Sequence, residues 1–509
     1  MEARPLSSPA QPAPSTDLAG GVPLAALPPG IDQRIDAAFQ PIADAVSSVV
    51  FFTVPVAGTE VPLIVVWLIA GATWFTIALR GINIRGFRHA LRILMGREDG
   101  DDEPGAVSHF QALTTAVSGT VGVGNIAHVA VAVSIGGPGA AFWMAIAGFL
   151  GMSSKFAECA LGVKYRRANP DGSLSGGPMY YLEVGLRALD RARLGRGLAL
   201  YYALCIALAA IGMAMFQANQ AFAQLVAVTG GASSFAAGRG WLVGSLLAVS
   251  VGVVIVGGIR SIARFTAKLV PAMALLYLGC ALVVIGAHAE RLPEAFVRIA
   301  TEAFTPHGVT GGVLGVVVLG FRRAAFSNEA GLGSSSIAHS VVRTREPLTQ
   351  GFVAMLEPFL DTVVICSITA LVIVTGIDAS ALGTGVASGV ELTSSVFAQV
   401  HPVLPRVLSI VVFLFAYSTL ISWSYYGLEG SIYLVGNSRR VRTAFNVFYC
   451  ACAIVGCTTR LTAILAFTDA ILFAMAFANL VGLYLLSPGL RADLDRYWTA
   501  IRARRRARA

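Results

Sequence analysis

Long apolar runs separated by short polar segments dominate the chain from residue 61 onward. Eleven runs are long enough to cross about 30 Å of hydrocarbon at about 1.5 Å of helix rise per residue. They lie at about 61–80, 112–137, 140–163, 199–228, 240–259, 265–288, 309–340, 350–376, 405–435, 443–459 and 461–487. The pattern predicts an all-α integral membrane protein, with a transmembrane domain over residues 61–487.

The two ends of the chain follow different patterns. Residues 1–30 are rich in Pro, Ala and Ser, and we expect them to form a disordered tail. From Ile31 to Val50, apolar residues recur at helical spacing among polar ones, which predicts a helix at the membrane interface and then a linker to residue 60. Residues 488–509 end in RARRRARA and are predicted to form a basic cytoplasmic tail.

Composition supports a protein whose solvent is mostly lipid. The chain is 56% hydrophobic and 13% charged, with a mean hydropathy of +0.72, whereas a soluble domain has about 25% charged residues. The formal net charge is +9, but the basic residues lie in short segments between apolar runs, so we expect no nucleic-acid partner. The seven cysteines show no metal-ligand spacing, and we interpret them as small buried residues.

The distribution of Lys and Arg predicts the orientation. When alternate loops are assigned to opposite sides, one side collects about 27 of the 37 basic residues. That side is predicted to be cytoplasmic, which places the N-terminus outside and the C-terminus inside. Buried helices of a soluble protein would not produce this asymmetry.

Two of the apolar runs are interrupted near their middle. The second contains TVGVGN (Thr120 to Asn125), and the seventh contains FSNEAGLGS (Phe326 to Ser334). Unsatisfied backbone groups in lipid cost several kcal/mol each, so such breaks persist where they line a protein cavity. We expect the backbone to leave helical geometry at Gly122–Asn125 and at Ser327–Gly331, with the two breaks adjacent at mid-membrane.

The positions of the breaks suggest a repeat. After one extra span, they open two sets of five spans, at about 112–288 and 309–487, and an odd number of helices inverts the second set. A broken helix offers free N–H groups to a carboxylate and free carbonyls to an ammonium group or a cation. A zwitterionic amino acid satisfies both, which favours a secondary transporter working by alternating access; two Gly-rich packing faces are the other explanation.

Two other classes of protein were weighed on the same residues. The TVGVG segment is similar to a potassium selectivity filter, but a channel of this length needs several filters and the chain has one. The same glycines suggest a nucleotide loop, but no Lys-Ser or Lys-Thr pair follows them. We therefore expect a transporter, not a cation channel or an enzyme.

Several long motifs resemble the alanine or glycine:cation symporter family, also called the sodium:alanine symporters. They are TVGVGNIAHVAVAVSIGGPGAAFWM, KFAECALGVKYR, GGPMYYL, FRRAAFSNEAGLGSSSIAHS, FLDTVVICSITALVI and FAYSTLISWSYYG, in this order. The resemblance covers residues from about 60 to 490. It implies the five-plus-five inverted-repeat fold of the leucine transporter with one extra N-terminal helix, and a bacterial cytoplasmic (inner) membrane location. It also implies import of alanine or glycine with sodium as the coupling ion and no organic cofactor; coupling to protons and the oligomeric state stay open.

The resemblance also implies site residues. Those expected around the substrate are Gly122, Gly124, Asn125, Gln217, Phe326, Ser327, Asn328 and Trp423. Those expected around sodium are Val121, through nearby carbonyls, and the hydroxyls of Ser418 and Thr419. Each has a structural alternative: the hydroxyls bond carbonyls of their own helix, Trp423 is core, and Gln217 joins helices.

The chain departs from the family pattern at two positions, and it carries other charges in its apolar runs. His128 stands where the family usually has glycine, so either a titratable ring borders the site or a neutral ring packs on a neighbour. Leu428 intervenes before Glu429, so no role is carried to Glu429. Charges at such depth are functional candidates, and we expect the two arginines to pair with Glu329 or Asp361. These charges are Lys155, Glu158, Arg322, Arg323, Glu329, Asp361 and Asp469.

Overall fold

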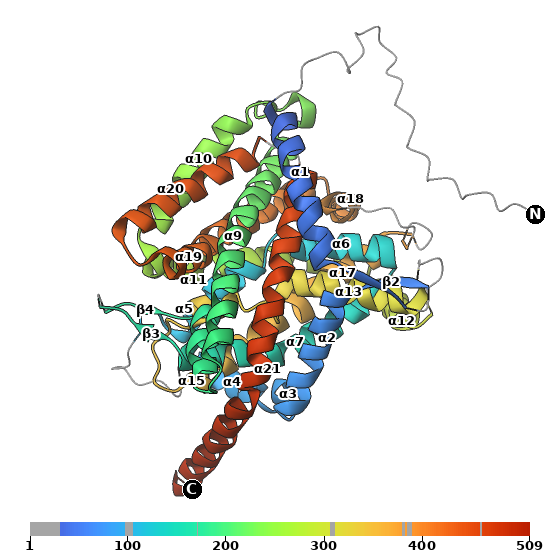
Figure 1. Cartoon of the computed structure of the whole chain (residues 1–509). Helices are drawn as coiled ribbons and strands as arrows, with labels where there is room; N and C mark the ends of the chain where they lie inside the picture. Colours follow the sequence, from blue (N-terminus) through green and yellow to red (C-terminus); the bar gives the residue numbers. More distant parts are fainter. Residues whose placement is uncertain are drawn as a thin grey trace, which may run out of the picture.

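Helices form most of the chain that the computed structural model describes, which is residues 31–508 without 57, 97–104, 171, 306–310, 379–381, 384–388 and 459–460 (Figure 1). The predicted disordered tail, residues 1–30, lies outside the described residues. Two small antiparallel hairpins accompany the helices. They pair β1 (Thr53–Val56) with β2 (Thr59–Pro62), and β3 (Arg167–Ala168) with β4 (Leu174–Ser175).

Each of the eleven predicted apolar stretches coincides with one helix or with consecutive helices. In chain order these are α2 (Leu63–Ala78), α5 (His109–Thr120) with α6 (Gly124–Gly136), α7 (Gly139–Lys164), α9 (Ala192–Val228), α10 (Gly240–Ile255), α11 (Gly258–Ala287), α13 (Gly312–Asn328) with α14 (Ser335–His339), α15 (Pro347–Ala354) with α16 (Leu356–Pro358), η5 (Phe359–Cys366) and α17 (Ser367–Gly376), then α19 (Leu404–Val435), α20 (Arg439–Gly456) and α21 (Leu461–Arg508). The connecting helices are α1 (Ile31–Val50), α3 (Ile82–Arg85), α4 (Phe87–Leu94), α8 (Pro178–Tyr180), η2 (Tyr181–Gly185), η3 (Gly231–Ser233), η4 (Ala289–Arg291), α12 (Leu292–Glu302) and α18 (Val390–Val400).

The chain is a multi-pass membrane protein. By length and composition, six described helical segments can cross a bilayer, and the bent pair α5 and α6 makes a seventh. The helices α2 and α10 are apolar but shorter. The count of eleven spans and the inverted repeat stay predictions.

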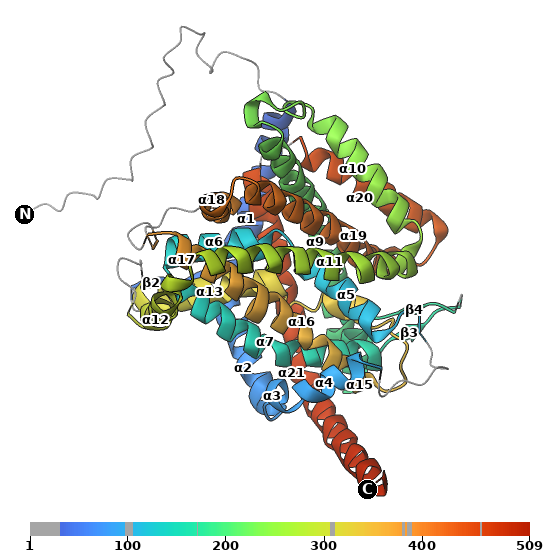
Figure 2. The same cartoon turned by 180° about the vertical axis from the view of Figure 1, so that it is seen from behind.

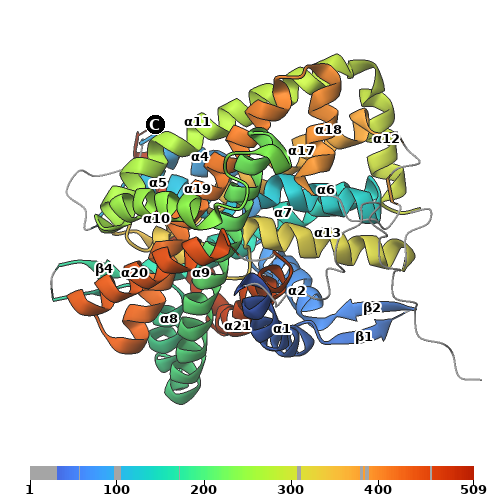
Figure 3. The same cartoon turned by 90° about the horizontal axis from the view of Figure 1, so that it is seen from above.

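Three of the longest helices form one packed layer. Helix α9 packs along α19 and α21, and α21 continues beyond the bundle at its C-terminal end (Figures 1 and 2). Residues 488–508 of the predicted basic tail therefore continue α21 as helix. Helix α1 packs along α21, and the β1–β2 hairpin that follows it projects from the side of the bundle (Figure 3). The predicted interfacial helix and linker thus appear as a helix and a hairpin.

A second group of helices holds the interrupted segments. Helix α5 packs between α11 and α19, whereas α6 packs against α13 and α17. Helix α7 packs against α13, α15 and η5. The ends of α5, α6 and α13 are therefore enclosed by neighbouring helices, as backbone breaks in a bilayer require.

The first break lies where the sequence predicts it. A capping box begins α5, because Ser108 Oγ accepts the Gln111 N–H at 3.2 Å and Gln111 Oε1 accepts the Ser108 N–H at 3.0 Å. The helix ends after Thr120, since Val121 adopts an extended backbone with φ −73° and ψ 94°. Helix α6 begins at Gly124, and the axes of the two helices differ by 45°. The departure from helix at Gly122 is confirmed, but Gly124 and Asn125 already belong to α6.

The second break lies further along the chain than predicted. We expected the helix to end at Ser327, but α13 continues through Asn328 and ends where Glu329 takes a left-handed backbone with φ 54°. Glu329 is the C-cap of the helix, and its N–H bonds Ala325 O. Asn328 is held in the last turn by its side chain, since Oδ1 accepts the Ala330 N–H at 2.9 Å and Nδ2 donates to Thr362 Oγ1 at 3.0 Å. The interruption therefore spans residues 329–334, before α14.

Candidate substrate and cation site

The gap between α5 and α6 leaves four backbone polar groups without partners. No hydrogen bond among the described residues uses the N–H of Val123 or Gly124, or the carbonyl oxygen of Thr120 or Val121. Val121 and Val123 are fully buried. Buried backbone groups are almost always paired, so two donors and two acceptors left open at one gap mark a place where a zwitterion or a cation can bind.

Asp361 links the ends of the two broken helices. Asn125 Nδ2 donates to Ser327 Oγ at 3.1 Å and to Asp361 Oδ1 at 2.6 Å. Ser327 and Thr362 donate to the other carboxylate oxygen, at 2.8 and 2.7 Å. Asn125 Oδ1 also accepts the Gly122 N–H at 2.9 Å. The two breaks are thus adjacent, as predicted, through the start of α6 and the last turn of α13.

Thr419 and Gln217 border the first break beside Gly122. A Cβ atom added to Gly122 would lie 2.9 Å from Thr419 Oγ1 and 3.4 Å from Gln217 Nε2. Gln217 is buried, and its Oε1 has no hydrogen-bond partner. Thr419 donates its hydroxyl hydrogen either to Ser118 O at 3.1 Å or to Phe415 O at 3.0 Å. The oxygen of Thr419 is left to accept a cation or another donor.

Phe326 and His128 border the same break beside Gly124. A Cβ atom added to Gly124 would lie 3.6 Å from His128 Nδ1 and 3.8 Å from Phe326 Cδ1. The two rings pack edge to face with centroids 4.1 Å apart, and Phe216 packs on the other side of Phe326 at 6.4 Å. The side of the gap away from Thr419 is therefore lined by rings.

Ser418 and Trp423 contact α5 before the break. Ser418 Oγ donates to Phe415 O of its own helix at 2.9 Å, which is the structural alternative considered for this residue, and Ser418 O accepts from Ser118 Oγ at 2.8 Å. Trp423 is fully buried, and its Nε1 donates to Gly119 O at 3.2 Å. The backbone carbonyl of Ser418 and the side chain of Trp423 hold α19 against α5, and the roles of the two residues toward substrate or sodium stay predictions.

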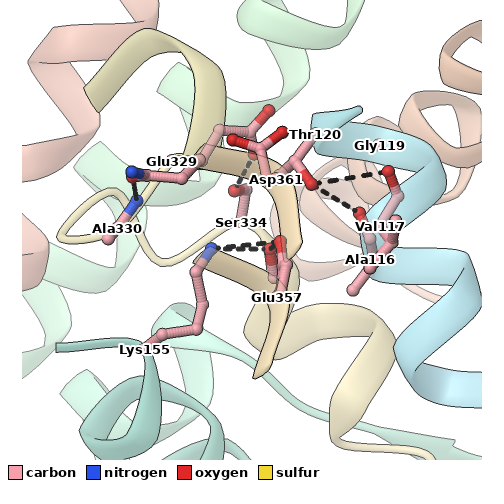
Figure 4. Close-up of polar contacts among 12 residues, drawn as sticks. Ala116, Val117, Gly119, Thr120, Lys155, Glu329, Ala330, Ser334, Glu357 and Asp361 are labelled. Carbon is pink, nitrogen blue, oxygen red and sulfur yellow. Dashed lines mark hydrogen bonds and ion pairs between the residues drawn. The ribbon is translucent and has the colours of Figure 1, made fainter. Parts of the chain in front are cut away.

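A buried ion pair supports the second break from below. Lys155 Nζ lies 3.3 Å from Glu357 Oε1 and donates to Ser335 Oγ at 2.8 Å, with both charged side chains fully buried (Figure 4). Ser335 also donates to Glu357 Oε1 at 2.7 Å, and His339 Nε2 lies 3.7 Å from Glu357 Oε2. The start of α14 is therefore tied to α7 and α16 by charge-assisted contacts.

Two more buried glutamates occupy the turn of the second break. Glu158 Oε1 accepts the Gly331 N–H at 2.7 Å and a hydrogen bond from Asn479 Nδ2 at 2.9 Å. Asn479 Nδ2 also donates to Gly331 O at 2.8 Å, and Glu329 accepts from Ser334 Oγ. Both backbone groups of Gly331 are thus satisfied by side chains from α7 and α21.

The predicted pairing of Arg322 and Arg323 with Glu329 or Asp361 is wrong. Arg322 instead faces Asp469 of α21, with Nη2 3.9 Å from Oδ2, and none of the ion pairs of the described residues joins either arginine to the two predicted acids. The reason is geometric: Glu329 turns toward Ser334, and the oxygens of Asp361 receive neutral donors. Proximity along the chain did not reveal the approach of α21.

Several buried polar residues around the second break were not identified from the sequence. Glu357, His339 and Asn479 lie in apolar stretches, and Gln350 connects His339 to His109. Glu357 was detectable in principle, because it is an acidic residue in a predicted span. The amide and imidazole groups carry no such signal, since polar neutral residues are common in helix interfaces.

Comparison with known proteins shows the family to which the chain belongs. A family model described as the sodium:alanine symporter family matches residues 45–508. The sodium/alanine symporter AgcS of Methanococcus maripaludis is 37% identical over 428 residues, covering 84% of this chain and 92% of the relative. The probable sodium/glutamine symporter GlnT of Bacillus subtilis is 32% identical over 438 residues, covering 86% and 87%. Among solved structures, a manganese transporter of Eremococcus coleocola is similar, with 13% identity, coverage of 78% and 82%, and a TM-score of 0.48.

Proposed function

We propose that this chain, which belongs to the sodium:alanine symporter family, imports alanine or glycine together with sodium by alternating access. Like its relatives, it is a transporter and not an enzyme. We further propose that it works in the bacterial inner membrane, with the N-terminus outside, the C-terminus in the cytoplasm and two inverted sets of five spans.

One observation carries the proposal: the open backbone groups of the first break match a zwitterion. The free N–H groups of Val123 and Gly124 lie at the positive end of the α6 dipole, which favours a carboxylate. The free carbonyls of Thr120 and Val121 lie at the negative end of α5, which favours an ammonium group or a cation. Gln217 Oε1, buried and unpartnered beside Gly122, adds an acceptor for the ammonium group.

Sodium binding is supported by oxygen atoms on the α19 side of the break. Sodium is a hard cation that prefers oxygen ligands, as calcium and magnesium do. The carbonyl of Val121 is open, and Thr419 donates its hydrogen away from Gly122, so its lone pairs remain for an ion. Ser418 lies one residue earlier and completes the proposed set. In this arrangement the ion and the substrate share one stretch of unwound backbone, which couples their binding.

Small substrates fit the other side of the break. A Cβ atom built on Gly124 would already be in van der Waals contact with His128 and Phe326, so the two rings lie close to the backbone and limit the size of a side chain bound on this side. An extra methylene in a close-packed pocket discriminates by about 1–3 kcal/mol. We therefore propose alanine and glycine in preference to leucine or to glutamine, the substrate named for one relative.

The proposal is tested with purified protein in proteoliposomes. Uptake of labelled alanine and glycine is measured with inward sodium and proton gradients applied separately, and leucine and glutamine are added as competitors. We expect saturable uptake that requires sodium and is inhibited at least tenfold less by leucine than by alanine. Uptake that follows the proton gradient without sodium would show that protons are the coupling ion, and unitary currents would indicate a channel.

A further inference from the structure

We propose that His128 is a substrate-contacting residue that extends the specificity to a small hydroxyl amino acid, serine. The inference rests on the proposed function, because it places the ligand against the first break. It concerns a side chain to which the proposed function assigns only packing beside the substrate.

The first observation is an unpartnered polar atom. His128 lies one turn into α6 and is 4% exposed, and its Nδ1 has no hydrogen-bond partner. Leaving a buried nitrogen unpaired costs free energy, and such groups in native proteins call for an explanation. A ring that only filled space would be replaced at no such cost by leucine or phenylalanine.

The second observation is the direction in which Nδ1 points. The Phe326 ring fixes the imidazole from one side, with centroids 4.1 Å apart and planes inclined by 68°. Nδ1 then faces the α-carbon side of Gly124, 3.6 Å from where a Cβ would stand. The unpaired nitrogen therefore lies beside Gly124, at the end of the first break where the N–H groups are open and the substrate is proposed to bind.

The chemistry of this space selects a hydroxyl group. A serine side chain adds one oxygen to the methyl of alanine, and that oxygen can either donate to Nδ1 or accept from it, whichever tautomer is present. The hydroxyl would satisfy the imidazole, whereas valine or threonine would place an additional methyl group against Phe326. Gln217 Oε1 is the other unpartnered side-chain atom at this break, and it lies at the Gly122 end. His128 Nδ1 and Gln217 Oε1 are thus placed to bond different ends of one small amino acid.

The test compares serine with alanine in the wild type and in two variants. Inhibition of labelled alanine uptake is measured for His128→Leu, which keeps the volume without a polar atom, and for His128→Gln, which keeps a hydrogen-bonding group. His288→Leu is the matched control, because this histidine lies at the end of α11 and bonds Val284 O of its own helix. Serine is expected to inhibit the wild type about as well as alanine. In His128→Leu the inhibition constant of serine should rise about five- to tenfold more than that of alanine, and His128→Gln should retain most of the serine inhibition.

Thermal stabilisation of the purified protein by serine and by alanine separates this inference from the proposed function. It reports binding even if transport is absent. It also serves if His128→Leu does not insert into the membrane, because the stabilisation by serine relative to alanine can still be measured in the wild type and in His128→Gln. Serine that fails to stabilise or inhibit the wild type would overturn the inference. The inference would also be overturned if the ratio of the serine to the alanine inhibition constant were the same in His128→Leu as in the wild type. A wild type that binds serine but transports no amino acid would contradict the proposed function alone.

Discussion

The two interrupted helices differ in which backbone groups their neighbours satisfy. In the second break, the three successive N–H groups of residues 330–332 each have an acceptor, and the carbonyls of residues 331 and 332 each have a donor, whereas no hydrogen bond among the described residues uses the N–H groups of Gly333 and Ser334. In the first break, the two N–H groups of residues 123 and 124 and the two carbonyls of residues 120 and 121 have no partner among the described residues. The charges differ as well: the ion pair of Lys155 and Glu357 lies at the second break, and the carboxylate of Asp361 reaches the first break through Asn125.

This difference indicates a division of labour. An unsatisfied backbone group in a bilayer costs several kcal/mol, so the bonds to residues 330–332 help to fix the second break. The open groups of the first break gain that free energy when a ligand arrives, and we therefore expect ligand binding there to stabilise one conformation. Asp361 accepts hydrogen bonds from both Asn125 and Ser327, and it therefore links the residues beside the two breaks.

The largest expected effect comes from removing a charge beneath the second break. Lys155→Met leaves Glu357 buried without its cation, and breaking one side of a buried pair destabilises by about 3–5 kcal/mol. Thermal unfolding in detergent measures this loss. Arg187→Met is the control, because its partner Glu183 is partly exposed and such pairs contribute about 0–1 kcal/mol. Equal melting temperatures for the two variants would show that the second break is not held by its charges.

The next prediction contrasts two glycines of the first break. Gly122→Ala places a methyl group 2.9 Å from Thr419 Oγ1, closer than side-chain atoms normally approach, whereas Gly124→Ala meets its neighbours at 3.6 Å or more. We expect Gly122→Ala to lower alanine uptake by at least a hundredfold. Gly124→Ala should place its methyl group beside His128 and Phe326 and so narrow the pocket. We expect alanine uptake to fall about tenfold and glycine uptake to stay close to the wild-type rate. Initial uptake rates at matched membrane expression measure both, and a harmless Gly122→Ala would separate Thr419 from the site.

The sequence predicted the helices well because long apolar runs determine them locally. It located the first break because the glycines and small polar residues of TVGVGN destabilise a helix locally. It placed the start of the second break too early because Asn328, the last residue of α13, bonds Thr362 of another helix, a contact that the local sequence does not show. The same limit explains why Arg322 was assigned the wrong acid, whereas Glu357, an acidic residue in a predicted span, could have been found from the sequence. Pairing across hundreds of residues depends on tertiary packing, which hydrophobic pattern does not encode.

A smaller effect is expected when the proposed sodium ligands are separated. Thr419→Val removes an oxygen that faces Gly122, whereas Ser418→Ala removes one that bonds Phe415 O of its own helix. The sodium concentration for half-maximal uptake should rise about five- to tenfold in Thr419→Val and about twofold in Ser418→Ala. Uptake is measured against sodium at fixed, saturating alanine. Equal shifts in both variants would place the ion further from the break than proposed, and unchanged sodium dependence in both would reject these ligands.

The smallest effect concerns the contact that closes the last turn before the first break. Trp423→Phe keeps an aromatic ring but removes the hydrogen bond from Nε1 to Gly119 O, and a neutral hydrogen bond contributes about 0.5–1.5 kcal/mol net. Because Gly119 stands three residues before Gly122, a looser turn should weaken the binding of alanine by about two- to tenfold without changing the discrimination against leucine. Trp423→Leu also removes ring volume, so it should weaken alanine further and admit larger side chains. Competition by alanine and leucine distinguishes the two roles. If Trp423→Phe already admits leucine, the indole borders the substrate directly; if even Trp423→Leu keeps the wild-type ratio, Trp423 acts only by holding α19 to the end of α5.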